Sequence, residues 1–510
     1  SFNNGQFPPR WASDVHFGYG SPLLSFNYQL PYYLGYPLYK IGFGLVHTFK
    51  LLMASSVLLG ALGVYLLGLS LGTPLIALTG SVIYTYLPYH ALDVFVRGTL
   101  GESWAIAIFP FVILSLTRAI KKPSTLRIIW AGVSLALLIL AHQIAFMFAL
   151  PVVFALLLSM SLESDLKNRL FTIIKSLFWA LGLSAFYLLP LFLERGFIQH
   201  SSPFNFYDHF PFIKQLIYSK WGYGASVIGP YDGLSFQLGF VFLFLVLVSL
   251  IALVKSPFSK QNRPILSLVG IIVTLLYLMN IRSSWLWETF FLSQTIQFPW
   301  RLLMVTVWIA PNLYYFLATR FLFMASFKMS LIISAVSLFT VLPMYRPGEL
   351  ADHTDSYFLR RFLPKIILVN GETISKDYLF HTEDYVPLPV GATRPTKLPP
   401  NRMESENGTI IKELSSKPYQ YLAKLNTPTE DKLTFQAFYY PGWKVLLDQQ
   451  PVKITPNQMG FVSFTVPKGD HKLQILFTKS PIRFLGDIIS LVIFLLTVQL
   501  IIYHSYKKHV

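Results

Sequence analysis

The chain has 510 residues, of which 54% are hydrophobic and only 13% charged, and its mean hydropathy is +0.52. Soluble globular domains carry roughly 25% charged residues, so this composition excludes an ordinary soluble protein and indicates a polytopic membrane protein. Cysteine is absent, which excludes disulfide bonds and thiolate metal sites.

The chain opens with an aromatic and partly polar segment, residues 1–47, before the first apolar run. This segment holds the cation Arg10 and the carboxylate Asp14, the pairing expected of a catalytic loop. Its aromatic side chains include Tyr19, Phe26, Tyr28, Tyr32 and Tyr33. Two interpretations stay open for these rings: anchoring in the lipid headgroup zone, or stacking on the faces of a sugar.

Apolar runs close to the roughly 20 residues that cross a bilayer recur along the chain. They predict about eleven transmembrane helices, over residues 48–70, 75–93, 103–119, 127–141, 143–161, 170–192, 235–254, 265–281, 301–320, 329–344 and 484–505. Because the chain starts with Ser rather than Met, we expect an additional upstream span, which gives about twelve in all.

Lys and Arg gather in the short loops on one side of these spans, so that side is cytoplasmic. The C-terminus then lies in the cytoplasm, and Ser1 and the long loops lie outside. This topology signal accounts for much of the net charge of +17 without a nucleic-acid partner. Long outer loops and short inner loops place any active site on the outer face.

The second outer loop, "YLPYHALDVFVRGTLGESWA" at residues 86–105, carries Asp93, Arg97 and Glu102 between two apolar helices. Charges at membrane level are energetically unfavourable and usually face one another or a polar cavity. One interpretation is therefore an Arg97–Glu102 pair that only holds the loop in shape. The alternative is that Arg97 binds a phosphate while a carboxylate contacts a sugar hydroxyl.

Two further polar positions lie at the outer ends of predicted spans. His142 follows residue 141 in "AHQIAF" and is either a hydrogen-bonded structural residue or a substrate contact. The segment "SQTIQFPWR", residues 293–301, places Gln297 and Arg301 at the mouth of another helix. The guanidinium group of Arg301 is suited to two-point phosphate binding. The outer side of the membrane, where Arg301 is expected to lie, is otherwise poor in positive charge.

Residues 345–481 are predicted to form an extracytoplasmic β-rich domain, because short β-rich runs alternate there with turn residues such as Pro441-Gly442 and Asp448-Gln449. This spacing favours an antiparallel sandwich. The predicted organisation is thus a transmembrane domain over residues 1–344, the β-rich domain over 345–481, and a last helix with a cytoplasmic tail over 482–510.

The sequence lacks a Walker loop, an HExxH motif and a serine-nucleophile elbow. The segments "PPRWASDVHFGYGSPLLSFNYQLPYYL", "YLPYHALDVFVRGTLGESWA" and "QFPWR" resemble the bacterial membrane proteins called 6-pyruvoyl-tetrahydropterin-synthase-related. The segment "YYPGWKVLLDQQPVKI…VPKGDHKLQILF" is similar to the C-terminal β-domain of YfhO-like relatives. These proteins in turn resemble the GT-C superfamily of polytopic glycosyltransferases.

This resemblance implies a multi-pass protein of the bacterial inner membrane that transfers a sugar from a polyprenyl-phosphate donor to a glycan or protein acceptor of the envelope. Such chemistry needs a base for the acceptor hydroxyl and cations for the departing phosphate. The candidate catalytic carboxylates are Asp14, Glu102 and Asp93. The candidate substrate-binding residues are Arg10, Arg97, His142, Gln297 and Arg301. A divalent metal is compatible with this chemistry, although the sequence shows no cluster of ligands.

Two other functions need no bond chemistry. A transporter or flippase for a lipid-linked sugar would use the arginines to carry the phosphate, and a non-catalytic assembly protein would use the β-rich domain to bind a partner. Transporters often show repeated halves and helices broken at mid-membrane. No clear internal repeat is visible and the polar residues lie at one face, so the transferase is favoured.

Overall fold

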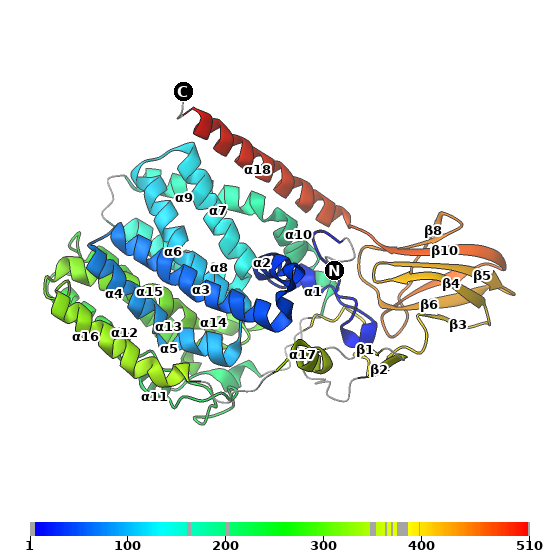
Figure 1. The fold of residues 1–510 in the computed structure, drawn as a ribbon, viewed down its shortest axis with the longest axis horizontal. Coiled ribbons are helices and arrows are strands. Elements are labelled where there is room, and N and C mark those ends of the chain that lie inside the picture. The colour runs from blue at the N-terminus through cyan, green and yellow to red at the C-terminus, as the bar shows by residue number, and fades with distance from the viewer. Residues whose placement is uncertain are drawn as a thin grey trace. The chain divides into compact units, whose positions relative to one another are not determined.

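The computed structural model describes residues 6–160, 165–199, 205–290, 292–346, 353–362, 365–368, 371–374, 386–396 and 398–507. It is mostly helical, with a β-sheet region toward the C-terminus (Figure 1). The chain divides into two compact units. The helical unit comprises Tyr28–Ser184, Phe204–Asp352 and Ile493–Val510. The β-unit comprises Ser1–Asn27, Ala185–Pro203 and His353–Val492.

The helical unit is built from α-helices joined mostly by short connections. Its helices are α2 (Leu30–Leu38), α3 (Gly44–Leu69), α4 (Pro74–Thr85), α5 (Pro88–Ala91), α6 (Leu100–Lys121), α7 (Thr125–Ala141), α8 (Gln143–Ser159), α9 (Leu166–Leu183), α11 (Ile213–Ile217), α12 (Phe240–Lys255), α13 (Arg263–Leu278), α14 (Ser284–Thr289), α15 (Met304–Arg320) and α16 (Phe327–Val341). The C-terminal part of α18 (Pro481–Tyr506) also belongs to it.

Each predicted span contains a helix, but the helices differ in length. Within the described residues, five helices are long and apolar enough to cross a membrane, or up to seven if each of two sharply bent helix pairs is one span. Four further apolar helices have only 10–17 residues. An α-helix rises about 1.5 Å per residue, so these four fall short of a hydrocarbon core of about 30 Å. The apolar helices are compatible with a multi-pass membrane protein, and the number of spans stays a prediction.

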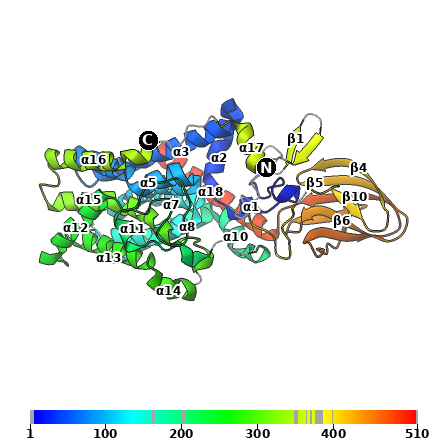
Figure 2. The same ribbon diagram turned by 90° about the horizontal axis from the view of Figure 1, so that it is seen from below.

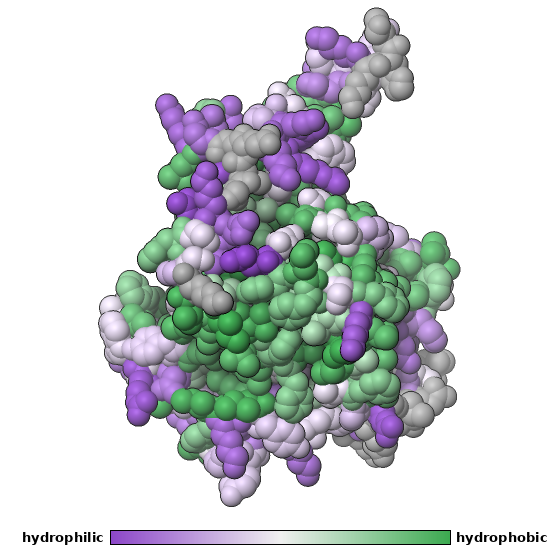
Figure 3. Space-filling model, turned by 90° about the vertical axis from the view of Figure 1, so that its left-hand side faces the viewer, coloured by the Kyte–Doolittle hydropathy of each residue, from purple (hydrophilic) through white to green (hydrophobic). Residues whose placement is uncertain are grey.

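The helices of this unit differ in what surrounds them. Nearly every residue of α6 and α15 is buried, so these two helices form its interior. Helices α3 and α16 expose large apolar side chains such as Leu58 and Phe339. Hydrophobic residues cover much of the face of this unit that is visible in Figure 3. A broad exposed apolar surface of this kind is typical of contact with lipid or with another protein.

The β-unit contains three antiparallel sheets, whose larger strands are visible in Figures 1 and 2. Its strands are β1 (Lys365–Leu368), β2 (Gly371–Ile374), β3 (Met403–Ser405), β4 (Ile410–Lys417), β5 (Gln420–Thr427), β6 (Asp431–Phe438), β7 (Trp443–Leu447), β8 (Gln450–Val452), β9 (Phe461–Val466) and β10 (Gly469–Phe477). The five-stranded sheet has the order β4-β5-β10-β7-β8, the three-stranded sheet the order β3-β6-β9, and β1 pairs with β2. Its short helices are α1 (Leu23–Phe26), α10 (Ala185–Leu193) and α17 (Asp355–Phe362).

The two larger sheets share one hydrophobic core, as expected for a sandwich. Ile475 and Val445 come from the five-stranded sheet, and Phe435 and Phe464 come from the three-stranded sheet. The predicted turn Pro441-Gly442 joins β6 to β7, and Asp448-Gln449 joins β7 to β8. The predicted β-rich region is therefore confirmed for residues 403–477. Part of the segment before it, including residues 375–385, lies outside the described residues.

The opening segment of the chain packs into this core. The Trp11 side chain is fully buried, and its ring lies 5.6 Å from that of Trp443 and 5.0 Å from that of Phe477. Tyr19 stacks on Phe461 at 4.6 Å, and its backbone carbonyl accepts a hydrogen bond from the amide of Phe438. The prediction that Tyr19 anchors in headgroups or stacks on a sugar is wrong, because its ring is already covered by protein.

The compact units thus differ from the predicted division at residues 344 and 481. The β-unit takes in residues 1–27 and 185–203 and the beginning of α18, in addition to the predicted β-rich segment. The physical reason is that apolar side chains of these added segments, Trp11, Phe17, Tyr19 and Ile198, are buried in the same hydrophobic core as the strands.

A buried ion pair also joins distant stretches within the β-unit. The Glu194 carboxylate, after α10, accepts hydrogen bonds from Arg483 Nε at 2.9 Å and from the Tyr440 hydroxyl at 3.0 Å. Ser480 Oγ donates to the same carboxylate. The side chains of Glu194 and Arg483 are each only 1% exposed. Three segments that are far apart in sequence therefore meet at one carboxylate.

Candidate functional site

The candidate site is built around the start of α6, where a short π-helical turn precedes the helix. This turn, η4 (Leu92–Arg97), places Asp93 and Arg97 four residues apart and therefore on the same side. Gly98 follows with φ of +58°, a left-handed conformation that glycine adopts without strain, and it turns the chain into α6. Glu102 then lies in the first turn of α6, where the helix dipole favours a negative charge.

Arg97 is the most connected of these side chains. Its guanidinium group makes two hydrogen bonds to the Glu102 carboxylate, one of them from Nη2 at 3.2 Å. Nη1 also contacts the Tyr89 hydroxyl at 2.8 Å and Asp93 Oδ1 at 3.1 Å. The guanidinium carbon lies 4.9 Å from the ring centre of Trp300, within the range of a cation–π contact. Arg97 is thus held from three sides by protein groups.

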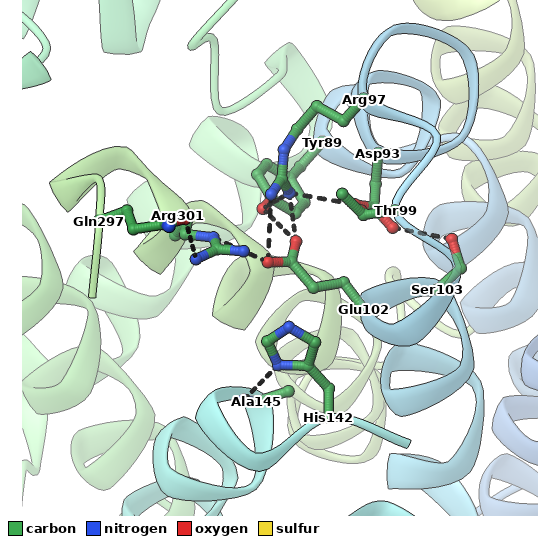
Figure 4. A network of polar contacts seen from close by, with 10 residues as sticks. All are labelled: Tyr89, Asp93, Arg97, Thr99, Glu102, Ser103, His142, Ala145, Gln297 and Arg301. Carbon is green, nitrogen blue, oxygen red and sulfur yellow. Dashed lines mark hydrogen bonds and ion pairs between the residues drawn. The ribbon is translucent and has the colours of Figure 1, made fainter. Parts of the chain in front are cut away.

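A second guanidinium group reaches the same carboxylate from a distant part of the sequence. Arg301 lies in the 3₁₀ turn η9 (Pro299–Leu303) that leads into α15, and its Nε is 2.9 Å from Glu102 Oε1. Its Nη1 contacts Gln297 Oε1 at 3.4 Å. Figure 4 shows Arg97 and Arg301 converging on Glu102 from different elements. Two cations therefore share one carboxylate that is only 1% exposed.

Asp93 is held by hydroxyl groups and has a different environment. Thr99 Oγ1 donates to its Oδ1, and Ser103 Oγ donates to its Oδ2 at 2.8 Å. The Asp93 side chain is fully buried. This arrangement fits a positioning role for Asp93, because hydrogen bonds and Arg97 already occupy both of its oxygens.

His142 lies between α7 and α8 and caps the latter helix. Its Nδ1 accepts a hydrogen bond from the amide of Ala145 at 3.2 Å, so a neutral ring carries its proton on Nε2. Figure 4 shows the ring turned toward Glu102. The ring centre of Tyr28 lies 6.2 Å from that of His142, in a stacked orientation.

The structure brings six of the eight predicted site residues together in the helical unit: Asp93, Arg97, Glu102, His142, Gln297 and Arg301. Arg10 and Asp14 belong to the β-unit instead. Arg10 is buried, and its Nη2 donates to the carbonyl of Phe186 at 2.6 Å and contacts Asp487 Oδ1 at 3.2 Å. Asp14 is exposed and accepts a hydrogen bond from Ser13.

Sequence reasoning missed four residues of the site: Tyr89, Thr99, Ser103 and Trp300. The first three lie in the predicted second outer loop, residues 86–105, together with Asp93, Arg97 and Glu102. Their hydroxyl groups could have been predicted as hydrogen-bond donors to carboxylates at membrane level. Trp300 is buried, and the guanidinium carbon of Arg97 lies over its ring. In the part of the chain that the structure describes, no group of three or more His, Asp or Glu side chains has the arrangement of a metal site.

Compared with models of known families, with curated proteins and with solved structures, the chain finds no match.

Proposed function

We propose that the chain is a multi-pass protein of the bacterial plasma membrane that transfers a sugar from a polyprenyl-phosphate donor to an envelope acceptor on the outer face. The observation that carries this proposal is the convergence of Arg97 and Arg301 on the buried carboxylate of Glu102. Two guanidinium groups beside a carboxylate, among apolar helices, supply both the cations and the base that such a reaction needs.

The reaction divides between these groups as follows. The acceptor hydroxyl attacks the anomeric carbon of the sugar, and the bond from that carbon to the phosphate oxygen breaks. Glu102 takes the proton of the hydroxyl, and polyprenyl phosphate leaves with the bonding electron pair. Arg97 and Arg301 stabilise the negative charge that develops on the phosphate. In the donor complex, the phosphate replaces Glu102 in some of the contacts that these two arginines make in the free protein.

Asp93 and His142 support this arrangement without contacting the reacting atoms. Asp93 orients Arg97 through a 3.1 Å contact and is itself held by Thr99 and Ser103. His142 caps α8 and presents its ring to the carboxylate side of the cluster. Asp14 remains a predicted alternative base from the β-unit.

Replacing Arg301 by Ala is expected to weaken donor binding about tenfold or more, because a charge-assisted contact to the phosphate is lost. The measurement is binding of a radiolabelled polyprenyl-phosphate sugar to the purified full chain in nanodiscs, with transfer to acceptor measured separately. Arg320→Ala is the matched control, since Arg320 is an exposed arginine at the far end of α15, the helix that follows Arg301.

Three outcomes decide between the candidate functions. Transfer that is lost together with binding in Arg301→Ala supports the transferase. Movement of intact donor between leaflets without release of polyprenyl phosphate overturns the transferase in favour of a transporter. Failure of the unaltered protein to bind the donor overturns both.

The proposed topology makes a separate prediction, that the β-unit lies outside the cytoplasm. Since the chain has no cysteine, a single introduced cysteine is the only thiol. Thr429 is exposed in the turn between β5 and β6, so Thr429→Cys should react with a membrane-impermeant maleimide in intact spheroplasts. Lys122→Cys, in the predicted cytoplasmic loop after α6, should react only after lysis. The reverse pattern contradicts the topology.

A further inference from the structure

The β-unit contains a cavity of about 310 Å³ that the candidate functional site does not use. Three cations line it, Arg10, Lys479 and Arg483, together with the aromatic side chains Phe7, Tyr419 and Phe477. Among the described residues, no carboxylate lines the cavity. Such a lining is suited to an anion that also carries apolar or ring-shaped groups.

Each of the three cations contacts a carboxylate that is not part of the cavity lining. Arg10 and Lys479 both contact Asp487, at 3.2 Å and 2.5 Å, and Arg483 contacts Glu194 at 2.9 Å.

Arg483 adds an independent observation. It is 1% exposed, and its Nη1 makes no hydrogen bond to any described residue, although Nε and Nη2 are both engaged. A buried charged donor without a partner is energetically unfavourable. An anion in the adjacent cavity would stabilise it.

The position of the cavity in the chain indicates what kind of anion it receives. Lys479 and Arg483 flank the start of α18, one of the helices long and apolar enough to cross a membrane. The helix then exposes Phe484, Leu485 and Ile488 by 59%, 53% and 41%. Cations followed at once by exposed apolar side chains match the boundary between lipid headgroups and acyl chains.

We propose that this cavity binds the phosphate group of an anionic phospholipid, whose acyl chains lie along the exposed apolar side of α18. The inference shares with the proposed function only the assumption that α18 lies in a membrane, and it concerns a different site in the other unit. The aromatic rings would then cover the glycerol portion of the headgroup. Lys479, which is half exposed, would contact the phosphate from the solvent side of the cavity.

Lys479→Gln tests this proposal, because its exposed ion pair contributes little to stability and the variant should fold. The full chain is extracted from nanodiscs of phosphatidylcholine that contain phosphatidylglycerol, and retained lipids are counted by native mass spectrometry. We expect Lys479→Gln to reduce the affinity for phosphatidylglycerol about tenfold, since a charge-assisted contact is removed. Lys479→Arg should retain it, and Lys468→Gln, in the exposed turn before β10, is the matched control.

A second arm separates a lipid from a free phosphate compound. Glycerol 3-phosphate presents the same phosphate without acyl chains, so it should compete only at far higher concentration than the lipid. Phe484→Ser should weaken lipid retention without changing competition by glycerol 3-phosphate. Equal affinity for both ligands overturns the lipid assignment, and unchanged retention in Lys479→Gln overturns the site. Donor binding measured on the same Lys479→Gln protein should be unchanged, which keeps this result separate from the proposed transferase.

Discussion

Replacing Glu102 by Gln is expected to lower the turnover of sugar transfer by roughly 10²–10⁴-fold, the loss typical of a missing general base. Glutamine keeps the size of the side chain and its capacity to accept a hydrogen bond, but it cannot take the proton of the acceptor. Donor binding should not weaken, because the carboxylate that occupies Arg97 and Arg301 in the free protein is gone. Single-turnover transfer and donor binding, measured on the same preparation, check this result.

A purely structural role for Glu102 predicts a different pattern. Removing one member of a buried ion pair costs about 3–5 kcal/mol, so activity could be lost because the protein unfolds. The double variant Glu102→Gln/Arg301→Gln restores the balance of charge and should recover part of the thermal stability under either explanation. Recovery of transfer along with stability contradicts the proposed role of Glu102.

Asp14→Asn provides the competing test for the base. Asp14 is exposed in the β-unit, so this substitution should leave folding almost unchanged. If Asp14→Asn abolishes transfer and Glu102→Gln does not, the base belongs to the opening segment of the chain.

Glu194→Gln is expected to destabilise the β-unit by about 3–5 kcal/mol, because it leaves the guanidinium group of Arg483 buried without a counter-charge. The same change weakens the contacts of Tyr440 and Ser480 with the carboxylate, which join three distant stretches of chain. Limited proteolysis of the full chain as a function of denaturant should show earlier cleavage within residues 403–477.

The matched control for this prediction is Glu406→Gln. Glu406 pairs with Lys432 at 3.9 Å, and both side chains are largely exposed. Exposed ion pairs contribute about 0–1 kcal/mol, so the control should behave almost like the unaltered protein. Equal effects of Glu194→Gln and Glu406→Gln would show that the buried pair does not hold the unit together.

Local patterns were sufficient to predict much of this fold. Apolar runs located a helix in each predicted span, since hydropathy is a property of consecutive residues. Turn residues such as Pro441-Gly442 and Asp448-Gln449 located the strand boundaries of the β-unit, and Asp448 and Gln449 both adopt positive φ there. Six of the predicted residues also lie together in the structure, because charged and polar side chains are rare between apolar helices and usually face one another.

The same local patterns failed where contacts are distant in sequence. Tyrosine and tryptophan are typical both of a membrane interface and of a β-core, so the composition of the opening segment could not distinguish the two environments. Only the structure shows that Trp11 belongs to the core beside Trp443. In the same way, nothing near Arg301 in the sequence indicates that it reaches Glu102.

The way the β-unit is assembled has a consequence for biosynthesis. The Tyr419 hydroxyl bonds the backbone carbonyl of Trp11 across 408 residues of sequence. At a translation rate of about 5–20 residues per second, the opening segment waits roughly 20–80 seconds before its partners emerge from the ribosome. During that interval its indole and phenol rings have no core in which to be buried. We therefore expect a chaperone or the bilayer surface to bind these rings in nascent chains. Newly made protein, rather than mature protein, should therefore be the form most vulnerable to aggregation and degradation.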